Sequence, residues 1–503
     1  LINHNTFINN HAYPIINNYY WEAYFTNNLF YNTQTKGEDF TVISLEPDNI
    51  PTDIIGIDTI TTNILVQAEV LADENTLAAP YNDIGNYIFY AADNIYFNQA
   101  TLDPYYNGEY NDIFDAPVSY LNWFGDGPHM VEVPTPFMNS RAKALSDGWA
   151  NIVYENNILE QDPGLNTVAI SEDDAEQHAI WNRTLYGVAE ETRTADMSGW
   201  YFGDNDPSTI PGFDTEDGDG ITKFTDLIED FSFTENLTSK SDGYTIGALH
   251  WTNEINAFDK DASLNNIKKA YEVAILTDGL DDTLYIVGGQ ANAGLLEATI
   301  NNDKDESGNR NHPNRVYKLE KDQLHFQLAA INVENPNGTL RIVGETGGKK
   351  PVIIPITTND IGVGVNLING SLELKNVHYQ AMNEQGGFTQ DNESQWELNG
   401  LNRKLLVEDC LFEFTNFQLF MANAVTEGLE IEMRNNYFRD LFWDQQWWAS
   451  RVFQAKVPID RLIFENNTVS GSGMALLQQE ALTLYALINH NTFINNHAYP
   501  IIN

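Results

Sequence analysis

The chain has 503 residues, of which 72 are acidic and 26 basic, for a formal net charge of −46. This balance disfavours nucleic acid or an anionic membrane as a partner, because binding to phosphate needs clustered lysine and arginine. Hydrophobic residues make up 42% of the chain, enough for a large core, and no apolar run of about eighteen residues predicts a membrane span. The single cysteine, Cys410, excludes an intrachain disulfide framework and a cysteine zinc site.

The chain begins and ends with the same segment. LINHNTFINNHAYPIIN occupies residues 1–17 and again residues 487–503, so the two copies start 486 positions apart (487 against 1). A match of this length does not arise by chance. The period therefore bears on how the chain is organised.

A shorter sequence repeat runs through this segment and its neighbours. Short β-type runs, each followed by a polar turn, recur every twenty to thirty residues and end in related five-residue motifs. Such spacing predicts the coils of a solenoid rather than the hairpins of a sandwich. The motifs are KNVHY (375–379), EDCLF (408–412), RNNYF (434–438), ENNTV (465–469) and NHNTF (489–493), continued by TNNLF (26–30) when the second copy is read on through the first.

The second residue of each motif predicts a structural ladder. Asparagine at a tight corner can bridge backbone groups of successive coils, which stack about 4.8 Å apart. One ladder at the corners explains all these positions together, whereas a catalytic role would have to explain each one. The predicted members are Asn376, Asp409, Asn435, Asn466, His490 and Asn27.

Longer stretches carry a resemblance to a known family. The stretch NRVYKLEKDQLHFQLAAINVENPNGTLRIVGETGGKKPVI, together with YIFYAADNIYFNQATLDPYY and YTIGALHW, resembles the right-handed parallel β-helix of the pectate-lyase-like superfamily. The stretches are similar to the β-helices of large secreted proteins of marine Bacteroidetes. The resemblance implies an all-β, right-handed parallel β-helix solenoid that is extracellular or at the cell surface.

The order of the pieces predicts a permuted numbering. Pieces that resemble the end of such a protein precede pieces that resemble its beginning. Helical spacing behind Ser263 predicts a short helix that caps the open first coil. We expect residues 1–163 to be later coils, 164–257 the C-terminal part, 258–276 a linker and capping helix, 277–486 the N-terminal coils of the next module, and 487–503 a repeat of 1–17.

Two explanations of the period stay open. In the first, the sequence is a window on a tandem array of near-identical modules. In the second, a single module, circularly permuted in this numbering, stacks end to end with its copies. Both make identical modules the partner of the chain.

The richest charged stretch is MRNNYFRDLFWDQQWWASRVFQAKVPIDR, residues 433–461. A polysaccharide lyase of this superfamily needs a lysine or arginine base near carboxylates, and Lys456 or Arg451 with Asp440 and Asp444 could supply them. Charge pairing on a solvated turn is the favoured interpretation. No catalytic residue is carried over from the family, so an enzyme is the less favoured class.

Aromatic side chains form a second cluster. Exposed aromatics can stack on sugar rings or on a neighbouring subunit, although most tryptophans in a protein of this size are packing residues. The candidates are Trp443, Trp447, Trp448, Tyr19, Tyr20 and Trp21.

Two acidic loops offer oxygen ligands for structural calcium, the only cofactor considered. Either loop can equally be a polar Asp/Gly turn. The candidate ligands are Asp303, Asp305, Ser307 and Asn309 in the first loop, and Asp217, Asp219 and Asp226 in the second.

These observations favour a structural extracellular protein whose modules form a filament, sheath or adhesive fibre. The alternative is a polysaccharide lyase or a carbohydrate-binding β-helix that acts on an acidic glycan.

Overall fold

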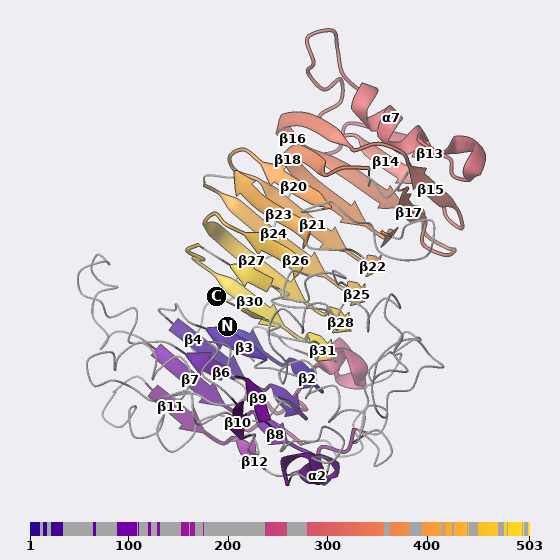
Figure 1. The fold of residues 1–503 in the computed structure, drawn as a ribbon. Helices are drawn as coiled ribbons and strands as arrows, with labels where there is room; N and C mark the ends of the chain where they lie inside the picture. The colour runs from indigo at the N-terminus through magenta and orange to yellow at the C-terminus, as the bar shows by residue number, and fades with distance from the viewer. Residues whose placement is uncertain are drawn as a thin grey trace. The chain divides into compact units, whose positions relative to one another are not determined.

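In the computed structural model, the recurring motifs form coils of a parallel β-solenoid (Figure 1). The chain thus has the predicted all-β fold, with long parallel sheets and short helices. The structure describes residues 1–10, 14–17, 22–33, 64–66, 88–107, 109, 119–121, 128–130, 152–159, 161–165, 175, 237–258, 279–356, 363–381, 395–413, 415, 418–424, 427–439, 441, 451–470, 477–479, 481–494, 496 and 501–502.

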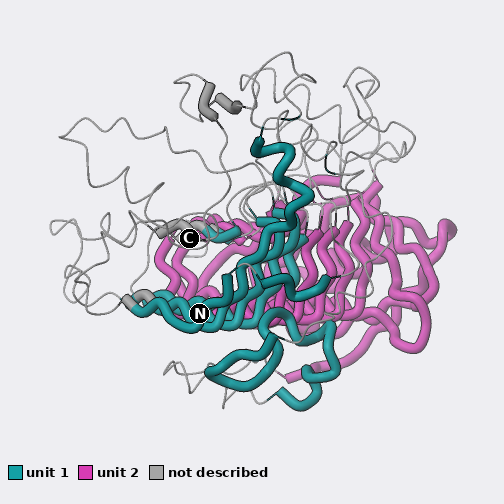
Figure 2. Tube along the Cα trace, turned by 90° about the horizontal axis from the view of Figure 1, so that it is seen from below, with its two compact units in different colours: residues 1–271, 444–447, 492–503 teal, residues 272–443, 448–491 magenta. Residues whose placement is uncertain are grey.

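The chain divides into two compact units (Figure 2). Unit 1 comprises Leu1–Tyr271, Asp444–Trp447 and Thr492–Asn503. Unit 2 comprises Glu272–Trp443 and Trp448–Asn491. The repeated segment therefore contributes its first copy, and most of its second copy, to unit 1.

Unit 1 has three parallel sheets. The first runs β1–β4–β7–β11, the second β31–β2–β5–β8–β12 and the third β32–β3–β6, while β9 and β10 form an antiparallel pair. The strands are β1 (Ile2–Asn3), β2 (Thr6–Ile8), β3 (Ile15–Asn17), β4 (Glu22–Thr26), β5 (Leu29–Tyr31), β6 (Ile64–Val66), β7 (Ile88–Ala92), β8 (Ile95–Phe97), β9 (Ser119–Leu121), β10 (Pro128–Met130), β11 (Ile152–Glu155), β12 (Ile158–Leu159), β31 (Thr492–Ile494) and β32 (Ile501–Ile502). The helices are η3 (Ala100–Leu102), α2 (Asp103–Tyr106), η6 (Leu249–Trp251) and η7 (Asn253–Ala257).

Unit 2 repeats this plan. Its first sheet runs β13–β14–β16–β18–β21–β24–β27–β30, its second β15–β17–β19–β22–β25–β28, and its third continues from β18 as β20–β23–β26–β29. The strands are β13 (Thr283–Ile286), β14 (Val316–Leu319), β15 (Leu324–Gln327), β16 (Asn332–Gly344), β17 (Val352–Pro355), β18 (Asn366–Lys375), β19 (His378–Gln380), β20 (Trp396–Asn399), β21 (Lys404–Glu408), β22 (Leu411–Glu413), β23 (Gln418–Ala424), β24 (Leu429–Arg434), β25 (Tyr437–Arg439), β26 (Arg451–Ala455), β27 (Ile459–Glu465), β28 (Thr468–Ser470), β29 (Leu477–Gln479) and β30 (Ala486–Asn489). The helices are η8 (Gln290–Asn292) and α7 (Leu295–Asn302).

The edge of β15 is covered by the segment that contains η8 and α7. Gly289 N donates to Leu324 O, and Gly294 N donates to Phe326 O, both at 2.8 Å. Glu297 of α7 accepts from Leu328 N at 2.8 Å. This segment satisfies backbone groups that an open edge strand would expose. The capping helix predicted at 259–276 lies outside the described residues.

Stacked aromatic rings fill the interior. Each motif ends in a residue that points into the solenoid, so equal side chains meet on successive coils. In unit 1 the ring of Phe7 stacks on Phe30 at 5.0 Å and on Phe493 at 5.1 Å. In unit 2 Phe412 stacks on Phe438 at 5.3 Å. All five rings are fully buried.

Candidate functional site

The six predicted ladder residues occupy the equivalent turn of six coils. Their φ angles fall between 52° and 57°, in the left-handed region. Asparagine and aspartate tolerate this region better than most residues with a side chain. Their backbone amides pair with the end of the next coil: Asn435 N donates to Glu465 O at 3.2 Å, and Asn466 N to Asn489 O at 3.1 Å. We call this set, with its unit 1 equivalents His4, Asp93 and Asn156, the turn column.

The repeating side-chain ladder is carried by the next residue along. Asn436 donates its backbone N–H and its Nδ2 to Oδ1 of Asn467, at 3.0 and 2.9 Å. Asn467 donates in the same way to Oδ1 of Asn491, at 2.8 and 3.1 Å. In unit 1 the same pattern runs from Asn5 to Asn28, Asn94 and Asn157. The amide ladder is therefore a column of asparagines beneath the turn column.

Both copies of the repeated segment contribute an asparagine to an amide ladder. Asn491 and Asn5 are equivalent residues of the two copies. Asn491 Oδ1 accepts from Asn467 in unit 2, whereas Asn5 donates to Asn28 in unit 1. A single asparagine with both sets of bonds would extend the ladder in one direction through the repeated segment.

The two copies also stack on each other within unit 1. The register pairs each residue with its own equivalent: Thr6 with Thr492, Phe7 with Phe493, Ile8 with Ile494 and Ile15 with Ile501. Asn496 Nδ2 donates to Oδ1 of Asn10, again its equivalent, at 3.3 Å. The segment is thus self-complementary as a coil.

Residues 237–258, which we call the strap, lie along the turn column of unit 1. Asp242 Oδ2 is 2.8 Å from Nε2 of His4 and accepts from Asn27 Nδ2 at 3.3 Å. Farther along the column, Lys240 N donates to Asp93 Oδ1 at 2.9 Å and Lys240 Nζ to Asn156 Oδ1 at 3.2 Å. The strap therefore binds side chains from four successive coils.

The strap also reaches both copies of the repeated segment. Ala248 N donates to Oγ1 of Thr6 at 2.8 Å, and Trp251 Nε1 donates to Oγ1 of the equivalent Thr492 at 2.7 Å. The ring of His4 faces two acceptors, Asp242 Oδ2 and, at 3.1 Å from Nδ1, Gly247 O. Both ring nitrogens of His4 therefore lie within hydrogen-bonding distance of the strap.

Apolar side chains complete this contact. The outward positions of the second sheet of unit 1 form a hydrophobic cluster with the strap and with Leu165, and all the sheet residues concerned are nearly or fully buried. Burial of such surface is worth about 25 cal/mol per Å². The cluster contains Ile8, Leu29, Tyr31, Ile95 and Ile494 from the sheet, Ile246 from the strap, and the partly buried Phe97, Ile158, Leu237 and Trp251 around them.

The equivalent face of unit 2 carries polar residues. Glu413 on β22 accepts from His378 Nε2 at 2.7 Å and forms an ion pair with Arg439 on β25. Burial alone would raise the pKa of Glu413, but the hydrogen bonds and charges of His378 and Arg439 outweigh it and lower that pKa. Nothing in the five-residue motifs pointed to this cluster, because its members come from three different coils.

Of the proposed lyase residues, the structure describes Arg451 and Lys456. Arg451 begins β26 and is buried, with its Nε donating to Gln478 Oε1. Lys456 follows the end of the same strand and is exposed. Five residues of extended chain separate the two Cα atoms by about 16 Å. Asp440 and Asp444 lie outside the described residues, as do the six candidate aromatic residues Trp443, Trp447, Trp448, Tyr19, Tyr20 and Trp21.

The first candidate calcium loop is held by its own contacts. Asp303 accepts from Tyr317 Oη at 2.6 Å and is 3.1 Å from Arg315 Nη1. Asp305 instead accepts from the backbone amides of Ser307 and Asn309, at 2.8 and 2.9 Å. Asp303 therefore faces a cation, and Asp305 accepts amide N–H groups of its own loop. Within the described ranges no group of three or more His, Cys, Asp or Glu residues could hold a metal ion. The second loop, with Asp217, Asp219 and Asp226, lies outside them.

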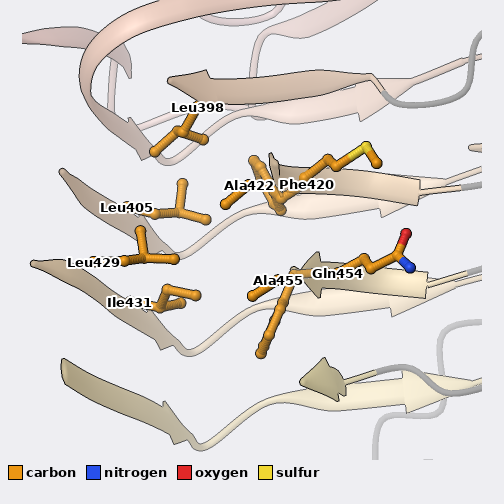
Figure 3. Close-up of a pocket in the computed structure, with 10 residues that line it drawn as sticks. Leu398, Leu405, Phe420, Ala422, Leu429, Ile431, Gln454 and Ala455 are labelled. Carbon is orange, nitrogen blue, oxygen red and sulfur yellow. The ribbon is translucent and has the colours of Figure 1, made fainter. Parts of the chain in front are cut away.

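A small gap lies in the core of unit 2, between side chains of neighbouring coils (Figure 3). Its volume is about 10 Å³, and Leu405, Phe420, Ile431 and Gln454 are among its lining residues. This is room for about one water molecule. The gap is therefore a packing defect and not a ligand site.

Cys410 occupies the ladder position of its coil. Its backbone N–H donates to Asn436 Oδ1 at 2.9 Å, and its thiol donates to Glu408 O at 3.2 Å. Burial raises its pKa to about 12. The thiol is inert at neutral pH, since the thiolate is the reactive form.

Comparison of the chain with protein-family models, with curated proteins and with solved structures gave no match. No helix in the described part of the chain is long and apolar enough to cross a membrane.

Proposed function

We propose that the chain is part of an extracellular structural protein whose β-solenoid modules form a filament, sheath or adhesive fibre. A parallel β-solenoid suits this role, because its backbone ladder is continuous along the axis and each coil contacts only its neighbours. The resemblance to pectate-lyase-like β-helices of secreted proteins supports the same setting. The formal net charge of −46 is compatible with a soluble surface outside the cell.

The observation that carries the proposal is that both copies of the repeated segment take the same place in an amide ladder and stack in register on each other. Asn491 Oδ1 accepts from Asn467, and the equivalent Asn5 donates its backbone N–H and its Nδ2 to Asn28 Oδ1. Two residues earlier in each copy, Asn489 Nδ2 donates to Glu465 Oε1 at 2.9 Å, and Oδ1 of the equivalent Asn3 accepts from Thr26 and Asn27 at 2.8 and 3.0 Å.

We infer that the repeated segment is a single coil in the natural order. The module then begins near residue 258, runs to 486, continues as residue 1 and ends near 257. Modules in this order join covalently in tandem or meet end to end.

The chain mass of native material under full denaturation, without proteolysis, tests the proposal. A mass of many periods supports a covalent array, and a mass near the 56.8 kDa of this chain supports end-to-end assembly if the native particle is a long oligomer. A native particle that is a monodisperse monomer of one module contradicts both.

A second candidate function is binding of an acidic glycan on the polar face of unit 2. The convergence of His378 and Arg439 on one outward face favours it, since both can pair with a carboxylate. Binding of alginate, pectin and glycosaminoglycans to the full chain, compared with the Arg439→Ala variant, tests it. Equal retention of all glycans by both proteins, or by neither, contradicts it.

A further inference from the structure

The turn column is largely covered in unit 1 and open in unit 2. In unit 1 His4, Asn27 and Asp93 lie beneath the strap and are 0%, 1% and 2% exposed. In unit 2 Asn435 is exposed and Asp409 is half-buried. The backbone turn is the same, because the φ angles of these five residues all lie between 50° and 57°. The two columns therefore share one geometry and differ in their cover.

The open side chains of the unit 2 column are unused. Those of Asp409, Asn435 and Asn466 form no hydrogen bond or ion pair among the described residues, whereas their backbone amides are all paired. In unit 1 the equivalent side chains bind Lys240 and Asp242 of the strap. The column of unit 2 thus offers to a ligand the donors and acceptors that unit 1 uses to hold the strap.

A row of outward side chains runs beside the turn column, two residues farther along each coil. In unit 1 this row includes Leu29 and Ile95, which the strap helps to bury. In unit 2 it includes Leu411 and Tyr437, which pair in register and are half-buried. A sugar ring has an apolar face and hydroxyl groups at its edge. It can therefore use an apolar or aromatic row and a polar row at the same time.

The charges beside the column favour a neutral ligand. The carboxylates of Glu408 and Glu465, one residue before the turns, form ion pairs with Lys375 and Arg434. Asp409 adds a carboxylate that has no ion pair within the described ranges. An acidic glycan would bring its own carboxylates close to Asp409, whereas neutral hydroxyl groups can donate to it.

The spacing of the column favours a polysaccharide over a peptide strand. Equivalent turns of successive coils lie about 4.8 Å apart. An extended polysaccharide advances by a similar distance with each sugar, so that successive sugars meet equivalent turns. A peptide strand advances by about 3.3 Å per residue, and its groups fall out of step with the coils.

We propose that the turn column of unit 2, together with Leu411 and Tyr437, binds a neutral, hydroxyl-rich polysaccharide that runs along the column. Asp409 accepts from sugar hydroxyl groups, Asn435 both donates and accepts, and the ring of Tyr437 stacks on an apolar sugar face. This goes beyond the proposed structural function and does not depend on how modules assemble. It also differs from the second candidate function, in which the ligand is acidic and pairs with Arg439.

Affinity electrophoresis of the full chain tests this site, in native gels that contain dextran, laminarin or hydroxyethyl cellulose. The double variant Asp409→Gly/Asn435→Gly removes two side chains and keeps both turns, since glycine adopts a positive φ freely. We expect the wild type to be retarded by at least one of these polysaccharides and the double variant to bind it at least about tenfold more weakly. Tyr437→Ala, which leaves the turns unchanged, should also weaken binding.

The matched control is Asn402→Gly. Asn402 is exposed and has a φ of 55°, but it lies at the other end of β21 and outside the turn column. We expect it to bind like the wild type, and circular dichroism of each variant checks that it folds.

Equal retardation of the wild type and the double variant, or no retardation of the wild type by any of the three polysaccharides, overturns the inference. Retardation by alginate alone, abolished by Arg439→Ala, overturns it in favour of the second candidate function. The proposed structural function is decided separately, by the mass of the chain and of the native particle, and none of these outcomes changes it.

Discussion

The second sheets of unit 1 and unit 2 share one backbone plan but differ on their outward face. In unit 1 the third strand position is Ile8, Tyr31 and Phe97 on successive coils, and the strap lies over it. In unit 2 the same position is occupied by polar residues: Gln380, Glu413, Arg439 and Ser470. The amide ladder beneath is the same in both units. The ladder thus builds the coil, whereas the outward position decides whether the coil needs a cover.

A charge beneath the strap should have the largest effect. Ile8→Glu places a carboxylate in the apolar cluster with no cation among the cluster residues, at a cost of about 3–5 kcal/mol. We expect the amides of Gly247 and Ala248 to lose protection from hydrogen exchange, since they donate to Asn27 O and Thr6 Oγ1. Gln380→Glu, at the same strand position in unit 2, is the matched control and should leave protection of its own coil unchanged. Equal losses in both variants would mean that the two faces do not differ.

Removal of a ladder amide should have the next largest effect on stability. The loss should be the same in unit 1 and unit 2. Asn467→Ala leaves Asn436 without its acceptor and deprives Met433 O and Asn491 Oδ1 of a donor. Unpaired buried groups of this kind cost about 1–3 kcal/mol each, partly offset by relaxation, so we expect a loss of about 2–4 kcal/mol in the free energy of opening.

Asn28→Ala in unit 1 should cost as much, measured by native-state hydrogen exchange of the peptides around each site. The control is Asn466→Gly, which changes the turn column instead. Glycine adopts its φ of 55° freely, so we expect a change below about 1 kcal/mol. A larger loss from Asn466→Gly than from Asn467→Ala would reverse the roles assigned to the two columns.

The solenoid was predictable from the five-residue motifs, because each one contains a turn residue followed three positions later by an inward apolar residue. The motif also held the signal for the amide ladder, in the residue that follows each predicted corner position. The turn position varies among Asn, Asp and His, as left-handed geometry allows. The following position needs an amide that both donates and accepts, and four of the six motifs have asparagine there: Asn436, Asn467, Asn491 and Asn28.

The difference between the outward faces of the two units could also be predicted in part from the sequences of their strands. The strands TFI, LFY and IYF of unit 1 are nearly continuous in apolar residues, which is typical of strands buried on both faces. Nothing local predicted which segment covers them, since His4 and Asp242 are 238 residues apart. The cluster of Glu413, His378 and Arg439 could not be predicted from the sequence either, because it depends on the register of three coils.

The smallest predicted effect is a loss of hydrogen-exchange protection at acid pH, which should be confined to unit 2. The folded-state pKa of Glu413 is lowered, whereas an unfolded glutamate titrates near about 4.3. Its contribution is therefore fully present above that value and is lost as the pH falls through the lower folded pKa. We expect hydrogen-exchange protection of β22 and β25 to fall over this acid range in the wild type. Glu413→Gln should be less protected at neutral pH, because it loses the charge that holds His378 and Arg439, and should show a flatter acid limb.

The exposed Glu427→Gln is the matched control and should keep the slope of the wild type. The strands β2 and β5 of unit 1 should show no such change in either variant, because the outward side chains Ile8, Leu29 and Tyr31 do not titrate in the acid range. An acid limb that is equally steep in the wild type and in Glu413→Gln would mean that the pair with His378 and Arg439 contributes nothing to unit 2. The polar face of unit 2 would then differ from the strapped face of unit 1 only by having no apolar cluster. The presence of Glu413, His378 and Arg439 would then have to be explained by binding of a ligand and not by stability.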